Sequence, residues 1–411
     1  MLLFQQKLNK IVSVAKPKVL LFSTLSPYPF WAGSENLWYD FVCDERVKKE
    51  IEFHIMLADS PVTRKKAQRL IENGVTVKFY THFSVSFSKR NLYKVRDKIA
   101  KKSHTTYPWY EEIRKGSYDL VWFNIAVTSD LLDLMHPVTL CLQNKIPYWL
   151  LLQLGGEGFY LGSETELDNF STVAMSAKRF IFIAKRNRMM VEKAIGQQLT
   201  NALESVNSIP AASISTAKQL SLQKSIDINR PARFFSLARF SPLVKGQPLL
   251  LEAFAGNEWK SRDWQLSFIG ISGFGKVYLE KLVKFYGLDK ERIKITEHKD
   301  NVLNEICEQD VLLMPSAAEG TPFAMIESMA CARPALGTAV GGIPELIKDG
   351  TSGWLCQTTA IQDISDKLHQ AWDQRGQWSG MGLAAQKFIE ENYSQQLSFE
   401  ELLKTLHTDV K

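Results

Sequence analysis

Two glutamates eight positions apart, Glu319 and Glu327, lie in the stretch EGTPFAMIESMACARPALGTAVGGIPELI, which ends at Ile347. Thr321 and Pro322 stand between them and predict the start of a helix. Threonine is a favoured N-cap, and proline has its backbone angle pre-set for the first helical position. The stretch therefore combines two acids with a predicted helix N-terminus, which indicates a binding site for a polar ligand.

The predicted helix start would provide an anion site. The backbone N–H groups of Thr321, Phe323 and Ala324 would point out of it, and the helix macrodipole favours a negative group such as phosphate there. An acid so close to a bound anion is poorly suited to hold the phosphate itself. We therefore expect Glu319 and Glu327 to accept hydrogen bonds from hydroxyl groups, such as those of sugars.

Flexible and cationic residues follow two other apolar runs. Gly341 and Gly342 would let the backbone approach a ligand closely. Arg239 and Lys245 stand six positions apart in FFSLARFSPLVKGQPLLLEAFA. Two cations near a diphosphate leaving group would stabilise the negative charge that develops on it, as a metal ion would otherwise do. In isolation, such a pair is more often a surface feature.

The elements that must position these residues recur along the chain. Short apolar runs, rich in β-branched and aromatic residues, occupy 18–24, 52–58, 75–81, 120–126, 148–154 and 179–185, and then 233–239, 264–270, 292–297, 311–316 and 334–340. Such runs, alternating with helices, predict parallel sheets covered on both faces. The stretch 200–230 lacks them, so we expect two doubly wound α/β domains with a boundary near residue 212. Ligands of such sheets bind beyond the carboxyl ends of the strands.

Composition narrows the class of protein. At 411 residues the chain is long enough for two or three domains. Its five cysteines are scattered and form no CxxC pair, which argues against a disulfide framework or zinc site and for a reducing compartment. The longest apolar run is too short to span a bilayer, and the N-terminus has no pattern of a signal peptide. We therefore expect a cytoplasmic protein.

Positive charge is concentrated in the first half. Residues 1–212 carry 28 Lys and Arg against 20 Asp and Glu, whereas the rest of the chain carries 22 against 24. Much of the excess lies in 88–102, where a solvated helix face is the favoured interpretation. The alternative is attraction to an anionic lipid surface or another acidic partner, at the inner face of the membrane. Nucleic acid is disfavoured because no reading motif accompanies the charge.

The string MPSAAEGTPFAMIESMACARPALGTAVGGIPELIKDGTSGWL resembles the E-x7-E region of glycosyltransferase family four, the group 1 retaining glycosyltransferases. The bare spacing of two acids is a weak signal, but the whole string is a specific one. The resemblance implies the GT-B fold, with two Rossmann-like domains facing across a cleft. It also implies that Glu319 contacts the donor sugar, that Glu327 holds the ribose, and that Arg239 and Lys245 clamp the donor diphosphate.

Other positions take expected roles from the same resemblance. On the donor side these are Gly270 in a loop after a strand and His298 near the nucleobase. In the first half, Gly33 matches the glycine loop that approaches the donor phosphate, although Ser34 replaces the usual second glycine. Acceptor or cleft candidates are Trp31, Ser34, Gln153 and Glu157. Gln153 stands where many members have histidine, and it cannot titrate near neutrality.

The resemblance implies a retaining, metal-independent transfer of a hexose from a nucleotide-diphosphate sugar, with no cofactor. UDP-glucose is the first expectation and GDP-mannose the second. The acceptor would be a saccharide or lipid-linked sugar, in polysaccharide or glycolipid synthesis. The expected domains are 1–212 for the acceptor, 213–390 for the nucleotide sugar, and 391–411 as a helix crossing back. Three alternatives remain: a nucleotide-sugar epimerase of related fold, a dinucleotide-dependent oxidoreductase and a non-catalytic nucleotide-sugar-binding protein.

Overall fold

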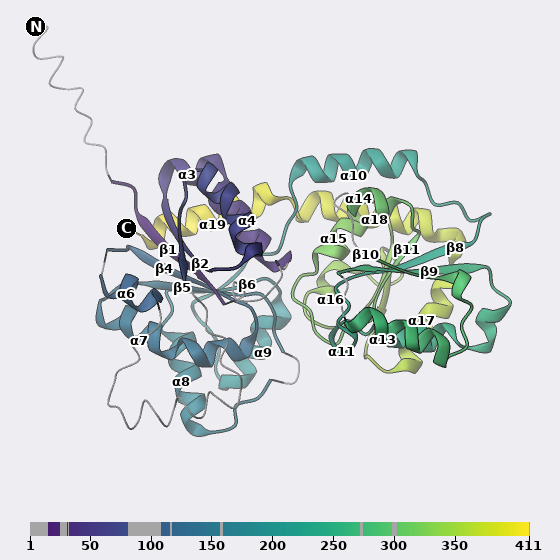
Figure 1. Cartoon of the computed structure of the whole chain (residues 1–411), viewed down its shortest axis with the longest axis horizontal. Helices are drawn as coiled ribbons and strands as arrows, with labels where there is room; N and C mark the ends of the chain where they lie inside the picture. The colour runs from purple at the N-terminus through teal and green to yellow at the C-terminus, as the bar shows by residue number, and fades with distance from the viewer. Residues whose placement is uncertain are drawn as a thin grey trace, which may run out of the picture. The chain divides into compact units, whose positions relative to one another are not determined.

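The computed structural model describes residues 15–24, 31, 33–80, 108–115, 117–156, 159–271, 274–297 and 302–410. This part of the chain contains two β-sheets, of seven and six strands, and helices lie on both faces of each (Figure 1). None of the described helices combines the length and the apolar character needed to span a membrane.

The first sheet has the strand order β3-β2-β1-β4-β5-β6-β7. Its strands are β1 (Lys18–Ser23), β2 (Glu52–Ala58), β3 (Thr76–Tyr80), β4 (Leu120–Ile125), β5 (Tyr148–Leu152), β6 (Arg179–Phe182) and β7 (Ala202–Glu204). The strand β1 pairs in parallel with both β2 and β4. The order therefore reverses between β1 and β4, which is the topological switch point of a doubly wound sheet.

The second sheet repeats this winding with the order β10-β9-β8-β11-β12-β13. Its strands are β8 (Ala232–Leu237), β9 (Trp264–Gly270), β10 (Ile293–Glu297), β11 (Val311–Met314), β12 (Ala335–Thr338) and β13 (Gly353–Cys356). All neighbouring strands in it pair in parallel. Its switch point lies between β8 and β11.

The helices connect and cover the strands. In the first half of the chain they are α2 (Asn36–Cys43), α3 (Glu45–Glu50), α4 (Pro61–Glu72), α6 (Pro108–Arg114), α7 (Met135–Gln143), α8 (Glu164–Met175) and α9 (Lys185–Ile195). In the second half they are α10 (Ala211–Gln223), α11 (Pro242–Lys245), α12 (Gln247–Phe254), α13 (Phe274–Phe285), α14 (Val302–Cys307), α15 (Phe323–Ala330), α16 (Ile343–Leu346), α17 (Ile361–Asp373), α18 (Trp378–Asn392) and α19 (Gln395–Asp409). Short 3-10 turns include Gly33–Glu35 before α2.

Every strand that the apolar runs predicted is present, and the two doubly wound sheets are confirmed. The sequence patterns missed β7 and β13. Each has at most four residues and lies at the edge of its sheet, so neither contains enough residues to produce a periodic pattern. The stretch that lacks apolar runs also contains α10, whose buried positions are few.

The chain divides into two compact units, one comprising Met1–Asn124, Asp133–Leu150 and Leu406–Lys411, and the other Ile125–Leu132 and Leu151–Thr405. The last turn of α19 belongs to the first unit, where the buried Trp149 indole donates to the Asp409 carboxylate at 3.0 Å. The predicted boundaries near residues 212 and 390 stay a prediction.

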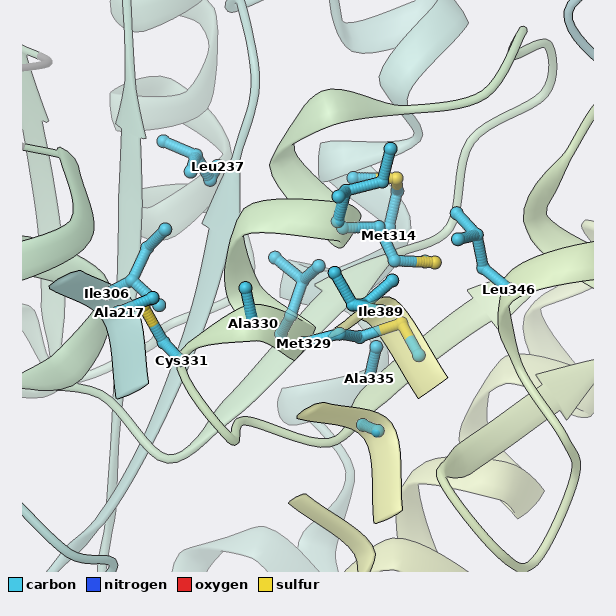
Figure 2. Close-up of a cluster of buried hydrophobic side chains, with 14 of the residues drawn as sticks. Ala217, Leu237, Ile306, Met314, Met329, Ala330, Cys331, Ala335, Leu346 and Ile389 are labelled. Carbon is cyan, nitrogen blue, oxygen red and sulfur yellow. The ribbon is translucent and has the colours of Figure 1, made fainter. Parts of the chain in front are cut away.

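Buried side chains alternate between the two faces of the second sheet. Phe235 and Leu237 belong to a core cluster on one face, whereas Phe234 belongs to the cluster on the other. Figure 2 shows the first cluster, in which Met329 and Ala330 of α15 pack with side chains such as Leu237, Met314 and Ala335 from the sheet. Because both faces are covered, the strands read as continuous apolar runs.

A buried arginine caps the C-terminal ends of three helices in the second unit. The Arg333 guanidinium is 2% exposed. It donates to the carbonyl oxygens of Cys307 at 2.7 Å and Cys331 at 3.1 Å, and also to that of Lys224. These carbonyls belong to the ends of α14, α15 and α10. A cation at a helix C-terminus is favoured by the macrodipole, and here one charge serves three helices.

Replacing Arg333 should therefore destabilise the second unit. We expect Arg333→Met to lower the free energy of unfolding by about 3 kcal/mol, because several buried carbonyls lose their donor. Lys387→Met, at an exposed position of α18, is the matched control and should change it by less than about 0.5 kcal/mol. Urea denaturation followed by tryptophan fluorescence measures both. Equal losses in the two variants would show that Arg333 is not the cap described.

Candidate functional site

The predicted donor residues gather at the switch point of the second sheet. The strands β8 and β11 are neighbours there, with Val311 opposite Phe234. Arg239 and Lys245 follow β8, and Glu319 follows β11. Since the carboxyl ends of parallel strands meet at one edge, the sheet topology brings residues from distant parts of the sequence into one place.

The centre of this site is the Glu319 carboxylate. Its Oε1 atom accepts hydrogen bonds from Lys245 Nζ at 2.7 Å and from Ser316 Oγ at 2.7 Å. The side chains of Lys245 and Glu319 are 17% and 7% exposed, so most of this ion pair is shielded from water. The Ser316 contact was not predicted, although this serine directly ends the apolar run that contains β11.

Backbone contacts join three loops around Glu319. The Ala317 amide donates to the Val244 carbonyl at 2.8 Å, which ties the loop after β11 to α11, the short helix that follows β8. The Thr338 hydroxyl, at the end of β12, donates to the Ser316 carbonyl at 2.5 Å. Glu319 is therefore fixed from two sides by hydrogen bonds that precede any ligand.

The glycine pair of the third loop packs against protein rather than facing open space. Gly341 has a φ of 50°, and a Cβ atom there would collide with the Glu319 carbonyl oxygen. The Gly342 amide donates to the Gly320 carbonyl at 2.7 Å. We expected these glycines to permit close approach of a ligand. The close approach that they permit in the structure is to the loop that carries Glu319.

The predicted cap of the helix between the two glutamates is wrong by one residue. Pro322, with a ψ of 117°, is the N-cap of α15, and its carbonyl accepts from the amides of Met325 and Ile326. Thr321 lies outside the helix, and its hydroxyl donates to a backbone carbonyl elsewhere in the fold. The amides of Phe323 and Ala324 still precede the first intrahelical donor, so two N–H groups remain at this N-terminus for an anion.

Glu327 lies in α15, on a partly buried surface. Desolvation by burial raises the pKa of its carboxyl from 4.5 to about 7. The carboxyl is therefore partly protonated near neutral pH, and in its protonated form it can both donate and accept a hydrogen bond.

Two other donor-side predictions have distinct surroundings. Arg239 is exposed, and its backbone carbonyl accepts from Gln247 Nε2 at 3.0 Å. Gly270 ends β9, where a Cβ atom would collide with the Ala238 carbonyl oxygen. Gly270 therefore lets the beginning of the Arg239 loop lie against β9. His298 lies outside the described residues.

The predicted residues of the first half lie near the ends of β1 and β5. Gly33 is exposed and begins the short turn before α2. Trp31 is half-buried, donates to Asn36 Oδ1 at 3.3 Å and packs on the rings of Trp38 and Tyr39. Gln153 is buried directly after β5. Glu157 and the side chain of Ser34 lie outside the described part of the chain.

Glu35 is a buried carboxyl at the switch point of the first sheet that was not predicted. It accepts hydrogen bonds from Ser23 Oγ at 2.9 Å, Asn124 Nδ2 at 2.7 Å and Trp38 Nε1 at 3.1 Å. Burial raises its pKa to about 7, against the lowering effect of these donors. Ser23 ends β1 and Asn124 lies in β4, so Glu35 fastens the turn that starts at Gly33 to both strands. The only sequence feature that pointed to Glu35 is its position directly after the predicted glycine loop residues Gly33 and Ser34.

Comparison with known proteins agrees with this geometry. Residues 219–394 match the family model described as glycosyl transferases group 1. A Methanocaldococcus jannaschii protein named as an uncharacterized glycosyltransferase is 25% identical over 330 residues, which cover 78% of this chain and 80% of the relative. The N-acetyl-alpha-D-glucosaminyl L-malate synthase of Bacillus anthracis is 29% identical over 121 residues, which cover 29% of this chain and only 32% of that relative.

Among solved structures, Anabaena HepE in complex with UDP-glucose has a TM-score of 0.68 and 17% sequence identity, covering 95% of this chain and 99% of HepE. At this identity the likeness concerns the fold, which is the expected GT-B fold. The similarity to group 1 glycosyl transferases covers residues 219–394. The glycosyltransferase class that the sequence indicated is thereby confirmed.

The raised pKa of Glu327 predicts a pH dependence of stability. The pKa of this carboxyl is 4.5 when the chain is unfolded and about 7 in the folded protein. The folded state therefore holds the proton more tightly, and the stability that protonation contributes at low pH is lost as the pH rises through about 7. Glu327→Gln removes the contribution, which amounts to at most about 3 kcal/mol. The melting temperature of the variant relative to the unchanged protein should therefore rise between pH 5 and pH 8. A difference that stays constant over this range would contradict the assignment.

Proposed function

We propose that the protein transfers a hexose from a nucleotide-diphosphate sugar to a hydroxyl group of a saccharide or lipid-linked acceptor, with retention of the anomeric configuration. UDP-glucose is the first candidate donor and GDP-mannose the second. The single observation that carries the proposal is the Lys245–Glu319 ion pair beside the N-terminus of α15, at the switch point of the second sheet. This arrangement offers cationic, dipolar and carboxylate groups to one ligand.

Each part of a nucleotide sugar has a suitable group in this site. The diphosphate would lie at the amides of Phe323 and Ala324, with Lys245 and Arg239 as counter-charges. A carboxylate such as that of Glu319 is an acceptor for sugar hydroxyls. Glu327, one helical turn further along α15 than these amides, would receive the ribose hydroxyls.

The proposed chemistry is a front-face displacement. The bond between the sugar C1 and the phosphate oxygen breaks, the bond from C1 to the acceptor oxygen forms on the same face, and the acceptor proton passes to the departing diphosphate. Glu319 is a poor nucleophile for the alternative double displacement, because Oε1 already accepts from an ammonium and a hydroxyl. A covalent glycosyl–enzyme intermediate trapped on the protein would overturn this mechanism.

The cations near the leaving group supply the transition-state stabilisation, and this mechanism needs no metal ion. Negative charge grows on the diphosphate as the sugar departs, and a preorganised ammonium in a shielded site interacts strongly with it. Lys245 is held beside Glu319 before the donor binds, and its ammonium would turn from this carboxylate to the phosphate as the donor enters.

The choice of UDP-glucose is supported by the solved complex of HepE with UDP-glucose. That protein shares the fold at low identity, so the donor is a proposal for this chain. The basic excess of residues 1–212 supports a location at the inner face of the membrane, where an acceptor linked to anionic lipid would be available. The segment 88–102 lies outside the described residues.

Two alternatives are distinguished by the products of the reaction. A nucleotide-sugar epimerase would convert the donor without an acceptor, and a non-catalytic binding protein would neither transfer nor hydrolyse it. We propose incubating the protein with a panel of nucleotide sugars and following thermal shift and slow hydrolysis. Stabilisation by one donor followed by release of its sugar to water or to an added saccharide supports the transferase, whereas interconversion of two sugars supports the epimerase.

The clamp role of Lys245 gives a quantitative prediction. Lys245→Ala should lower kcat/KM for the donor by about 10²-fold or more, because it removes one electrostatic contact to the leaving group. Lys387→Ala, which removes an exposed lysine on α18, is the control and should leave kcat/KM unchanged. Steady-state kinetics of donor consumption measure both. A loss of less than about threefold for Lys245→Ala would exclude the clamp role.

A further inference from the structure

The Lys245–Glu319 ion pair has a consequence for the product of the proposed reaction. We propose that Glu319 competes with the diphosphate for Lys245, so that the carboxylate which receives the donor sugar also weakens binding of the nucleoside diphosphate left after transfer. Glu319 would then determine the preference of the site for the sugar-bearing nucleotide over its product. This inference rests on the proposed function, and it adds a role for Glu319 beyond contact with the sugar.

The competition follows from where the carboxylate lies in the ligand-free protein. Lys245 Nζ and Glu319 Oε1 are 2.7 Å apart, which is the distance of a charge-assisted hydrogen bond. Glu319 is the ion-pair partner of Lys245 within the described part of the chain. An arriving phosphate oxygen would therefore meet an ammonium that is already neutralised by a carboxylate.

Glu319 cannot simply move away when an anion arrives. Ser316 Oγ donates to the same oxygen at 2.7 Å, and Ser316 is itself fully buried and held through its carbonyl by Thr338. The carboxylate is only 7% exposed. It would remain beside the bound diphosphate, and like charges in a poorly solvated site repel one another strongly.

The sugar of the intact donor offsets this cost. Its hydroxyl groups can donate hydrogen bonds to Glu319 and replace the contact with Lys245, so the carboxylate stays paired while Lys245 turns to the phosphate. A nucleoside diphosphate has no sugar at that position. Its binding therefore leaves Glu319 either without a counter-charge or in competition for the ammonium, and the product dissociates more readily than it would from Lys245 alone.

The test is the affinity for UDP and GDP, measured by titration calorimetry. Glu319→Gln preserves the shape of the side chain and removes its charge. It should bind the nucleoside diphosphate at least about threefold more tightly than the unchanged protein, which corresponds to about 0.7 kcal/mol. The same variant should bind UDP-glucose no more tightly than the unchanged protein, because the sugar loses its acceptor. Equal or weaker binding of the diphosphate would overturn the inference.

Glu390→Gln is the matched control for charge. Glu390 lies on α18 and pairs with Lys218 at 2.8 Å on an exposed surface. Its replacement by glutamine therefore removes the same charge as Glu319→Gln, from the same unit. Its affinity for UDP should stay within about twofold of the unchanged protein. If Glu390→Gln tightened binding as much as Glu319→Gln, a general effect of net charge would replace the proposed competition.

The double variant Lys245→Ala/Glu319→Gln identifies the partner. In this background the gain from Glu319→Gln should shrink, because there is no ammonium left to release and only the direct repulsion between the carboxylate and the diphosphate is removed. A gain as large as in the protein with Lys245 would show that Glu319 acts without involving Lys245, and would overturn the competition. Circular dichroism confirms folding of each variant. Ser316→Ala, which loosens Glu319 while keeping its charge, should give a smaller gain in affinity for the nucleoside diphosphate.

Failure of this inference and of the proposed function can be told apart. If the unchanged protein transfers sugar but Glu319→Gln does not tighten diphosphate binding, only the inference fails. If the unchanged protein binds neither UDP nor GDP while Glu319→Gln binds one of them, the inference is supported. If neither protein binds either nucleotide, the proposed function fails and the inference fails with it.

Discussion

The shared contact of Glu319 with Lys245 and Ser316 is the interaction on which the rest of the site depends. It joins a residue after β8 to two residues after β11, and these strands are adjacent only because the sheet reverses its order there. A sheet wound in another order would separate the ammonium from the carboxylate. The site is therefore a direct product of topology, and its charges are placed before any ligand arrives.

The helix α15 carries this arrangement between two fixed ends. At its N-terminus, Pro322 and the backbone of the Glu319 loop define where the first amides point. At its C-terminus, Arg333 compensates the helix dipole and also holds the ends of α10 and α14. Met329 and Ala330 pack between them into the core shown in Figure 2. A helix held at both ends and along its buried face can present an anion site with little loss of entropy on binding.

The sequence was sufficient for the two sheets, because continuous apolar runs are strong local signals, and the long motif around Glu319 singled out residues that the structure brings together after β8 and β11. It was insufficient where tertiary contacts decide the outcome. Thr321 is a residue type favoured at the N-cap, but its hydroxyl donates to a backbone carbonyl outside the helix. Gly341 lacks a side chain and was expected to let the backbone approach a ligand, but in the structure it packs on the Glu319 carbonyl. Glu35 was missed because its three donors come from β1, β4 and α2, which no local pattern connects.

The most direct test is a crystal structure of the protein with UDP-glucose bound. We expect the diphosphate to lie within hydrogen-bonding distance of the amides of Phe323 and Ala324, Lys245 Nζ to contact a phosphate oxygen, and the Glu319 carboxylate to face the glucose hydroxyls. A diphosphate bound away from the N-terminus of α15, with Lys245 still paired to Glu319, would contradict it.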